Sequence, residues 1–140
     1  MKTQDTALKP IPATAAVLAG GGSRRMGRDK ASLDWKGMPM GVHVARTVSP
    51  WFQETVVVTD NPAVFEGRPF RIEADVYPDK GTLGGVHGAL ASSGREWTFV
   101  ASCDMPFIAG DLVRLLWSLR EGHDVIVPLR DGRREVMYAF

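Results

Sequence analysis

The residues best suited to do chemistry lie in one short segment near the N-terminus. Three consecutive glycines follow an apolar run, and four cations come within the seven residues after Ser23: Gly20, Gly21 and Gly22, then Arg24, Arg25, Arg28 and Lys30. Successive glycines let the backbone approach a ligand closely and present its N–H groups to an anion. Crowded cations repel one another unless an anion offsets them. The segment therefore predicts a loop that binds a polyphosphate.

Two familiar phosphate loops do not fit this segment. The Walker pattern requires a lysine directly after its second glycine. The spacing from Gly22 to Gly27 is right, but Arg28 follows. The dinucleotide fingerprint fails because Arg25 stands where a small residue is required. The segment is thus a phosphate loop of a third kind.

The elements that position this loop alternate between strands and helices. Short apolar or β-branched runs predict strands at 14–19, 55–59, 70–74, 97–101 and 124–127. Helical spacing predicts helices at 38–51, at 83–93 and around Leu112, Leu115, Leu116 and Leu119, the last closed by Gly122. This alternation indicates an α/β fold with a mainly parallel sheet covered on both faces. Ligands of such sheets bind beyond the carboxyl ends of the strands.

Asp104 lies at such an end, three residues after the predicted strand at 97–101. An aspartate before a turn is often only a turn former. Beside a phosphate loop, a second role is the better interpretation. A carboxylate ~4 Å from a phosphate charge is repelled by ~4 kcal/mol at an effective dielectric constant of 20. Mg²⁺ between the two groups turns this repulsion into attraction, and it prefers one or two carboxylates with phosphate oxygens. Asp104 is therefore a candidate Mg²⁺ ligand.

The composition narrows the class of protein. Lys and Arg number 17 and Asp and Glu 16, so the formal net charge is +1, which argues against a dedicated nucleic-acid binder. Cys103 is the only cysteine, which excludes an intrachain disulfide and a multi-cysteine metal site. No apolar stretch has the ~20 residues that a membrane span needs. We expect a cytoplasmic protein with a polar tail at 1–12 and one domain at 13–140.

Three segments resemble one family. Residues 18–30, LAGGGSRRMGRDK, match the L-A-G-G-x-S-x-R-M-G-x-D-K signature of the molybdenum cofactor guanylyltransferases, the MobA family. Residues 75–85 are similar to its D…G-P-L-x-G segment, with Thr82 in place of proline, and residues 101–107 resemble its C-D-x-P segment. The resemblance runs from about Thr14 to the chain end. It implies a Rossmann-like nucleotidyltransferase fold of three layers, with a mainly parallel sheet and helices on both faces.

The resemblance also implies a reaction. The family transfers GMP from GTP to the terminal phosphate of molybdopterin with Mg²⁺ and releases pyrophosphate. Lys30 would bind the triphosphate, Arg24 would help to stabilise the leaving pyrophosphate, and Asp104 would hold Mg²⁺. The implied nucleotide-binding residues are Leu18, Ala19, Gly20, Gly21, Gly22, Lys30, Asp75, Asp104 and either Thr59 or Asn61, with Thr59 named first.

Two alternatives stay open. The chain could be a cytidylyl- or sugar-phosphate nucleotidylyltransferase. Gly21 distinguishes guanine-using from cytidine-using relatives, because the cytidine-using enzymes more often carry alanine at this position. It could also be a non-catalytic nucleotide-binding module. The chain ends at Phe140 within a predicted strand at 136–140, before the family's C-terminal segment. We therefore expect either a fragment or a shortened relative, with an apolar C-terminal edge that predicts self-association.

The remaining conspicuous residues read mostly as structural. Cys103 is expected to be a buried small residue, and His43 and His123 to be surface or packing residues. His87 could face the site. Five residues near the C-terminus alternate in charge and form either a solvated loop or part of the acceptor-binding surface: Arg130, Asp131, Arg133, Arg134 and Glu135.

Overall fold

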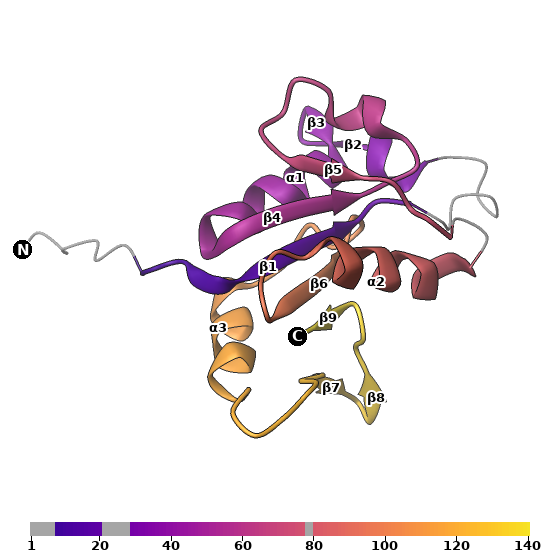
Figure 1. Cartoon of the computed structure of the whole chain (residues 1–140). Helices are drawn as coiled ribbons and strands as arrows, with labels where there is room; N and C mark the ends of the chain where they lie inside the picture. The colour runs from indigo at the N-terminus through magenta and orange to yellow at the C-terminus, as the bar shows by residue number, and fades with distance from the viewer. Residues whose placement is uncertain (1–7, 21–28, 78–79) are drawn as a thin grey trace, which may run out of the picture.

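The computed structural model describes residues 8–20, 29–77 and 80–140. Its centre is a five-stranded sheet in the order β5-β4-β1-β6-β9 (Figure 1). The strands are β1 (Ile11–Leu18), β4 (Phe52–Val58), β5 (Arg71–Glu73), β6 (Thr98–Ser102) and β9 (Tyr138–Ala139). Only β9 runs antiparallel to its neighbour, and the other pairs are parallel. This confirms the α/β fold with a mainly parallel sheet.

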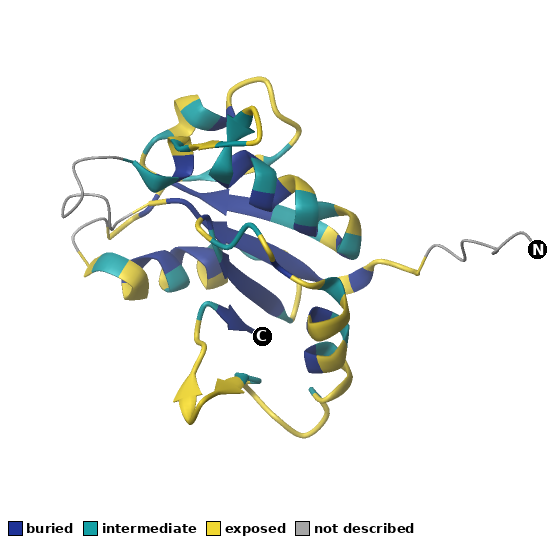
Figure 2. Ribbon diagram, turned by 180° about the vertical axis from the view of Figure 1, so that it is seen from behind, coloured by how far each residue is buried: buried dark blue, intermediate teal, exposed yellow. Residues whose placement is uncertain are grey.

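Helices cover both faces of the sheet, as the sequence predicts. They are α1 (Met40–Val48), α2 (Gly81–Ser92) and α3 (Gly110–Ser118), with 3₁₀ turns η2 (Lys30–Ser32), η3 (Ser49–Trp51) and η4 (Pro62–Phe65). Side chains of β1 alternate between two cores: Ala15 and Val17 join the core of α1 and α3, whereas Ala16 and Leu18 join that of α2. Most residues of the central strands β1, β4 and β6 are buried (Figure 2). No helix of the described residues is both long and apolar enough to span a membrane.

Two hairpins stand outside the main sheet. One joins β2 (Asp34–Trp35) to β3 (Met38–Pro39), and the other joins β7 (Leu129–Arg130) to β8 (Arg133–Arg134). Both turns contain a residue and a glycine with positive φ, which are Lys36 with Gly37 and Asp131 with Gly132. Such conformations are typical of tight two-residue hairpin turns.

Some predicted boundaries are wrong. β1 begins at Ile11 and β4 at Phe52, each three residues before the predicted start. The first helix ends at Val48, because Pro50 cannot donate the next backbone hydrogen bond and the chain continues as η3. α3 ends at Ser118, before Leu119 and Gly122.

The predicted strand at 124–127 is also wrong, because these residues form no ladder of their own. Ile126 alone bonds to the last residue, donating its N–H to the carbonyl of Phe140 at 2.9 Å and accepting the N–H of Phe140 at 3.1 Å. A run of β-branched residues at a sheet edge therefore does not by itself distinguish a full strand from a single residue that bonds to its neighbour.

The glycines of α2 serve close packing. A Cβ atom on Gly85 would lie 3.1 Å from Cδ1 of Leu18, and one on Gly88 would lie 3.2 Å from Cγ1 of Val58. α2 therefore lies almost directly on β1 and β4. This explains why a glycine-rich segment with low helix propensity forms a helix here, since tertiary packing outweighs propensity.

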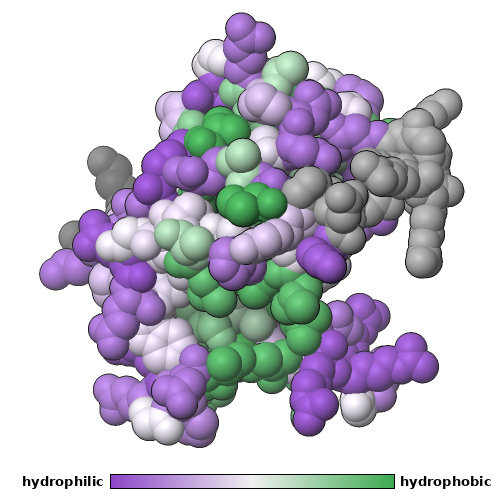
Figure 3. All heavy atoms as spheres, turned by 45° about the vertical axis from the view of Figure 1, so that its right-hand side comes forward, coloured by the Kyte–Doolittle hydropathy of each residue, from purple (hydrophilic) through white to green (hydrophobic). Residues whose placement is uncertain are grey.

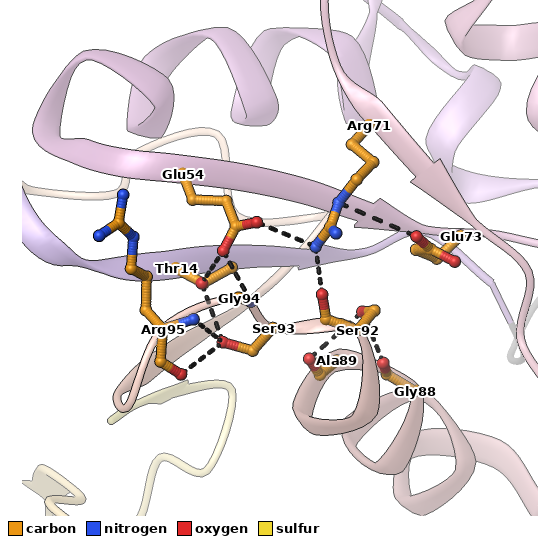
Figure 4. A network of polar contacts seen from close by, with 10 residues as sticks. All are labelled: Thr14, Glu54, Arg71, Glu73, Gly88, Ala89, Ser92, Ser93, Gly94 and Arg95. Carbon is orange, nitrogen blue, oxygen red and sulfur yellow. Dashed lines mark hydrogen bonds and ion pairs between the residues drawn. The ribbon is translucent and has the colours of Figure 1, made fainter.

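A polar network joins the amino-terminal ends of the strands (Figure 4). The carboxylate of Glu54 accepts hydrogen bonds from the hydroxyl of Thr14 and from the N–H of Gly94, and it lies 3.1 Å from the guanidinium of Arg71. Burial acts to raise the pKa of Glu54, but these hydrogen bonds and the charge of Arg71 outweigh it. The pKa therefore lies below the ordinary 4.5.

Replacing Glu54 by glutamine tests this network. A carboxyl whose pKa is lowered on folding stabilises the fold above its ordinary pKa and loses that contribution as the pH falls through the folded value. We expect Glu54→Gln to lower the free energy of unfolding by about 1–2 kcal/mol at pH 7, and the gap to narrow as the pH falls below 4.5. Urea unfolding across this range measures both.

The control is Glu73→Gln, because Glu73 is 3.9 Å from Arg71 and more exposed. It should cost less than about 1 kcal/mol. The free energies of unfolding of Glu54→Gln and the parent chain should differ less at low pH. A difference that is the same at every pH would show that the charge of Glu54 is not its cause.

Candidate active site

A cavity of about 510 Å³ opens at the carboxyl ends of β1 and β6. The end of β1 supplies Leu18, Ala19 and Gly20 to its wall, and residues 102–105 after β6 supply the facing side. These two strands are neighbours although the chain visits β4 and β5 between them. Ligands of open α/β sheets bind at such a reversal of strand order. The cavity is thus in the position that the fold favours for a ligand.

Backbone and hydroxyl hydrogen bonds hold the strand ends around this cavity. The N–H of Cys103 donates to the carbonyl of Leu18 at 2.9 Å, and the N–H of Ala19 donates to that of Val58 at 2.8 Å. The hydroxyl of Thr59 donates to the carbonyl of Ala19 at 3.0 Å. The backbone that lines the cavity is therefore fixed before any ligand binds.

Lys30 and Asp104 face each other in the cavity. Nζ of Lys30 lies 3.5 Å from Oδ2 of Asp104, and the two side chains are 39% and 44% exposed. Ion pairs this exposed contribute little to stability. The pair can therefore separate at small cost, and each charge can take a partner from a ligand.

Asp29 positions Lys30. One carboxylate oxygen accepts the N–H of Ala31 at 3.0 Å and caps η2, while the other accepts the amide of Asn61 at 2.8 Å. Both oxygens are thus engaged, although Asp29 also lines the cavity. Asp29 is not among the site residues predicted from the sequence. An aspartate directly before a helical turn was the signal that could have found it.

The predicted site residues divide into three groups. Leu18, Ala19, Gly20, Lys30 and Asp104 come together in the cavity wall. Gly21, Gly22 and Arg24 lie outside the described residues. The third group, Thr59, Asn61 and Asp75, is described but forms no part of that wall.

The members of the third group have local hydrogen-bond partners. The hydroxyl of Thr59, which is buried, donates to Ala19 and accepts the N–H of Asn61 at 3.0 Å. The amide of Asn61 bonds to Asp29. The carboxylate of Asp75 accepts the N–H of Tyr77 at 3.0 Å. As they stand, these residues support the backbone around the cavity.

Cys103 is a buried residue, as predicted. Burial raises the pKa of its thiol to about 12, and the charges of Asp104 and Asp29 add to the effect. A thiol with so high a pKa is not a nucleophile at neutral pH. His87 packs edge-on against Tyr77 and does not line the cavity, and His43 contacts the carbonyl of Pro106 at 3.3 Å. Covalent catalysis by these residues has no support.

The donor set fits Mg²⁺ held jointly with a substrate. Within the described residues, no group of three or more His, Cys, Asp or Glu side chains gathers as a metal cage. Asp104, whose carboxylate is half-exposed in the cavity, has oxygens that a ligand can reach. Mg²⁺ usually takes one or two carboxylates, substrate phosphates and water. A single accessible carboxylate beside a lysine suits that arrangement.

The chain is similar in sequence to molybdenum cofactor guanylyltransferases. A probable molybdenum cofactor guanylyltransferase of Clostridium perfringens is 32% identical over 130 residues, which are 92% of this chain and 65% of the relative. The molybdenum cofactor guanylyltransferase of Syntrophotalea carbinolica is 36% identical over 103 residues, 74% of this chain and 49% of the relative. The chain thus spans less than two thirds of the length of either relative.

Among solved structures, molybdopterin-guanine dinucleotide biosynthesis protein A of Archaeoglobus fulgidus superimposes with a TM-score of 0.72 at 28% identity. The match covers 90% of this chain and 65% of that one. The family model of the MobA-like NTP transferase domain matches residues 15–140, which include the carboxyl half of β1, all of β6 and every cavity residue named above. From Ala15 to Phe140, therefore, this chain belongs to the MobA-like NTP transferase family.

Proposed function

We propose that this protein transfers GMP from GTP to the terminal phosphate of molybdopterin and releases pyrophosphate. The observation that carries the proposal is the exposed pair of Lys30 and Asp104 in the cavity at the ends of β1 and β6. The names of the two relatives, both guanylyltransferases of the molybdenum cofactor, support the choice of substrates. The proposed domain runs from residue 13 to 140, and the expected cytoplasmic location stays a prediction.

The proposed reaction is a direct displacement. An oxygen of the acceptor phosphate forms a bond to the α-phosphorus of GTP, the bond from that phosphorus to the bridging oxygen of the β-phosphate breaks, and pyrophosphate leaves with the electron pair. Lys30 would turn from Asp104 to the triphosphate and stabilise the charge of the leaving group. Arg24, which lies outside the described residues, is proposed to assist it.

Asp104 would hold Mg²⁺ together with the phosphate oxygens. The ion, when bound, supplies Lewis-acid stabilisation of negative charge on the phosphates. The backbone at Leu18, Ala19 and Gly20 would bind the guanosine side. Gly21, Gly22, Thr59 and Asp75 stay proposed nucleotide contacts, and the last two would have to reach a nucleotide that extends beyond the cavity wall.

Removing either member of the charged pair should slow the reaction. We expect Lys30→Ala and Asp104→Ala each to lower kcat for GMP transfer by about 100-fold or more. The first variant removes the cation that would stabilise the leaving pyrophosphate, and the second removes the carboxylate that would hold Mg²⁺. Steady-state kinetics with GTP and molybdopterin measure this effect. Lys36→Ala is the matched control, since Lys36 lies on the β2–β3 turn and outside the cavity. Full activity in either variant would remove that residue from the mechanism.

Nucleotide binding distinguishes the proposed function from its alternatives. A nucleotide at ~100 times its dissociation constant should stabilise the fold by ~2.7 kcal/mol. We expect GTP with Mg²⁺ to raise the melting temperature more than CTP or ATP, in thermal-shift measurements with and without Mg²⁺. A preference for CTP or ATP would favour a cytidylyl- or sugar-phosphate nucleotidylyltransferase. Binding of GTP without transfer would favour a non-catalytic nucleotide-binding module.

Self-association through the C-terminal edge also stays a prediction, and an apolar groove beside that edge is the surface that would carry it. The groove, about 560 Å³ in volume, lies between α2 and the segment that leads into β9, with Leu83, Leu90, Val125 and Val136 exposed on its rim. Figure 3 shows apolar side chains gathered around a hollow on one face of the molecule. Because Ile126 already bonds to Phe140, a second copy would pack against side chains and not extend the sheet.

Sedimentation velocity tests this surface. We expect the parent chain to form a dimer at high micromolar concentration and Leu83→Glu to remain monomeric. Burying the carboxylate in an apolar contact costs free energy, because no opposite charge or hydrogen bond compensates for its lost hydration. Leu129→Glu is the control, because Leu129 is equally exposed but lies outside the groove. A monomeric parent chain over the whole range would refute self-association.

A further inference from the structure

The β7–β8 hairpin brings an arginine to the proposed active site. It joins Arg130 to Arg133 as an antiparallel pair through the tight turn at Asp131 and Gly132, and it lies below α2 in the view of Figure 1. Arg130 lines the same cavity as Lys30, which begins η2, and Asp104, which follows β6. The other two arginines of the hairpin, Arg133 and Arg134, do not line it.

Arg130 has little structural reason to be there. Its side chain is 81% exposed, and its ion pair in the described structure joins it to the neighbouring Asp131 at 4.0 Å, which is itself 93% exposed. Such a contact contributes almost nothing to stability. A guanidinium in this position is therefore available to a ligand, and its planar fork matches a phosphate in two parallel hydrogen bonds.

The charges of the cavity wall point to two anions. Lys30 is the cation on the β1 side and has Asp104 beside it, whereas Arg130 is the cation on the hairpin side. Among the described residues that line the cavity, these are the only two cations. The donor triphosphate would use Lys30. A displacement at the α-phosphorus brings a second phosphate into the same cavity, and its charge must be offset for the two to approach.

We propose that Arg130 binds the terminal phosphate of the acceptor and thereby defines an acceptor subsite on the β7–β8 hairpin; this rests on the proposed function. The acceptor class is a phosphate monoester whose body lies along the hairpin wall. Glu135 lines the same wall. Its carboxylate accepts hydrogen bonds and repels anions, so the body of the acceptor carries N–H or O–H donors and no second anionic group at that point.

Equilibrium binding of molybdopterin to the full chain tests this subsite without requiring turnover. The titrations follow the fluorescence of the pterin with the parent chain, Arg130→Ala and Arg133→Ala. We expect Arg130→Ala to raise the dissociation constant about tenfold or more, because a single charge-assisted hydrogen bond already accounts for a factor of about ten and the fork can form two. Arg133→Ala removes the same charge from the same hairpin outside the cavity, and it should leave the constant within about twofold.

Dephosphorylated molybdopterin completes a double-mutant cycle. If Arg130 binds the phosphate, the parent chain and Arg130→Ala should bind this probe equally. Equal loss of affinity for both probes would overturn the assignment to the phosphate. If Arg130→Ala and Arg133→Ala lose the same affinity for molybdopterin, the effect comes from the overall positive charge of the hairpin, and the specific role of Arg130 is overturned. If the parent chain does not bind molybdopterin, the subsite itself is overturned.

Binding of GTP is measured separately in each variant, because its result belongs to the proposed function. We expect the dissociation constant for GTP to be the same in Arg130→Ala as in the parent chain. If GTP binds and molybdopterin affinity is insensitive to Arg130, the acceptor subsite is wrong and the nucleotide site stands. If Arg130 controls molybdopterin affinity but GTP does not bind, the subsite stands and guanylyl transfer fails.

Discussion

The burial of β1 on both faces is the constraint on which the rest of the structure depends. The strand pairs with β4 on one side and β6 on the other, and its side chains alternate between the two cores. Its register with both neighbours brings Leu18, Val58 and Ser102 level at their carboxyl ends. The segments that follow the three strands therefore start from one line, and residues far apart in the sequence meet over it. The cavity follows from that alignment.

Stability and the proposed function occupy opposite ends of this strand. At the amino end, Thr14 and Glu54 form a network in which the charge of Glu54 is held by hydrogen bonds and by Arg71. At the carboxyl end, Lys30 and Asp104 form an exposed pair that contributes little. A tightly bonded charge stabilises the fold but is not available to a ligand. A loosely paired charge is available, because separating the pair costs little.

The C-terminal segment is held less by the sheet than by side-chain contacts. β9 has two residues, and Tyr138 attaches it to the start of α3 by donating to the carbonyl of Ala109 at 2.8 Å and accepting its N–H at 2.9 Å. The ring of Phe140 packs on that of Phe99, with centroids 5.0 Å apart. These contacts fix the segment that follows the β7–β8 hairpin, and the hydrogen bonds between Ile126 and Phe140 tie the segment that precedes it to the same place. They thereby place Arg130 at the cavity and leave the apolar groove open behind it.

The sequence alone predicted the order of the central strands and the three helices, the α/β class and the family, because apolar periodicity and a long glycine-rich signature are local properties of the chain. It also predicted Lys30 and Asp104 as site residues, from the family signature and from the position of Asp104 after a strand, and the structure brings the two side chains together in the cavity. Tertiary structure decided what depends on distant partners. Asp29 became an anchor because Asn61 lies beside it, Thr59 was turned to the carbonyl of Ala19, and the strand predicted at 124–127 was reduced to one bridge at Ile126. Whether Arg130 belongs to a solvated loop or to a cavity wall was likewise undecidable from its neighbours, since a hairpin turn fixes local shape but only packing of the whole chain fixes where the hairpin lies.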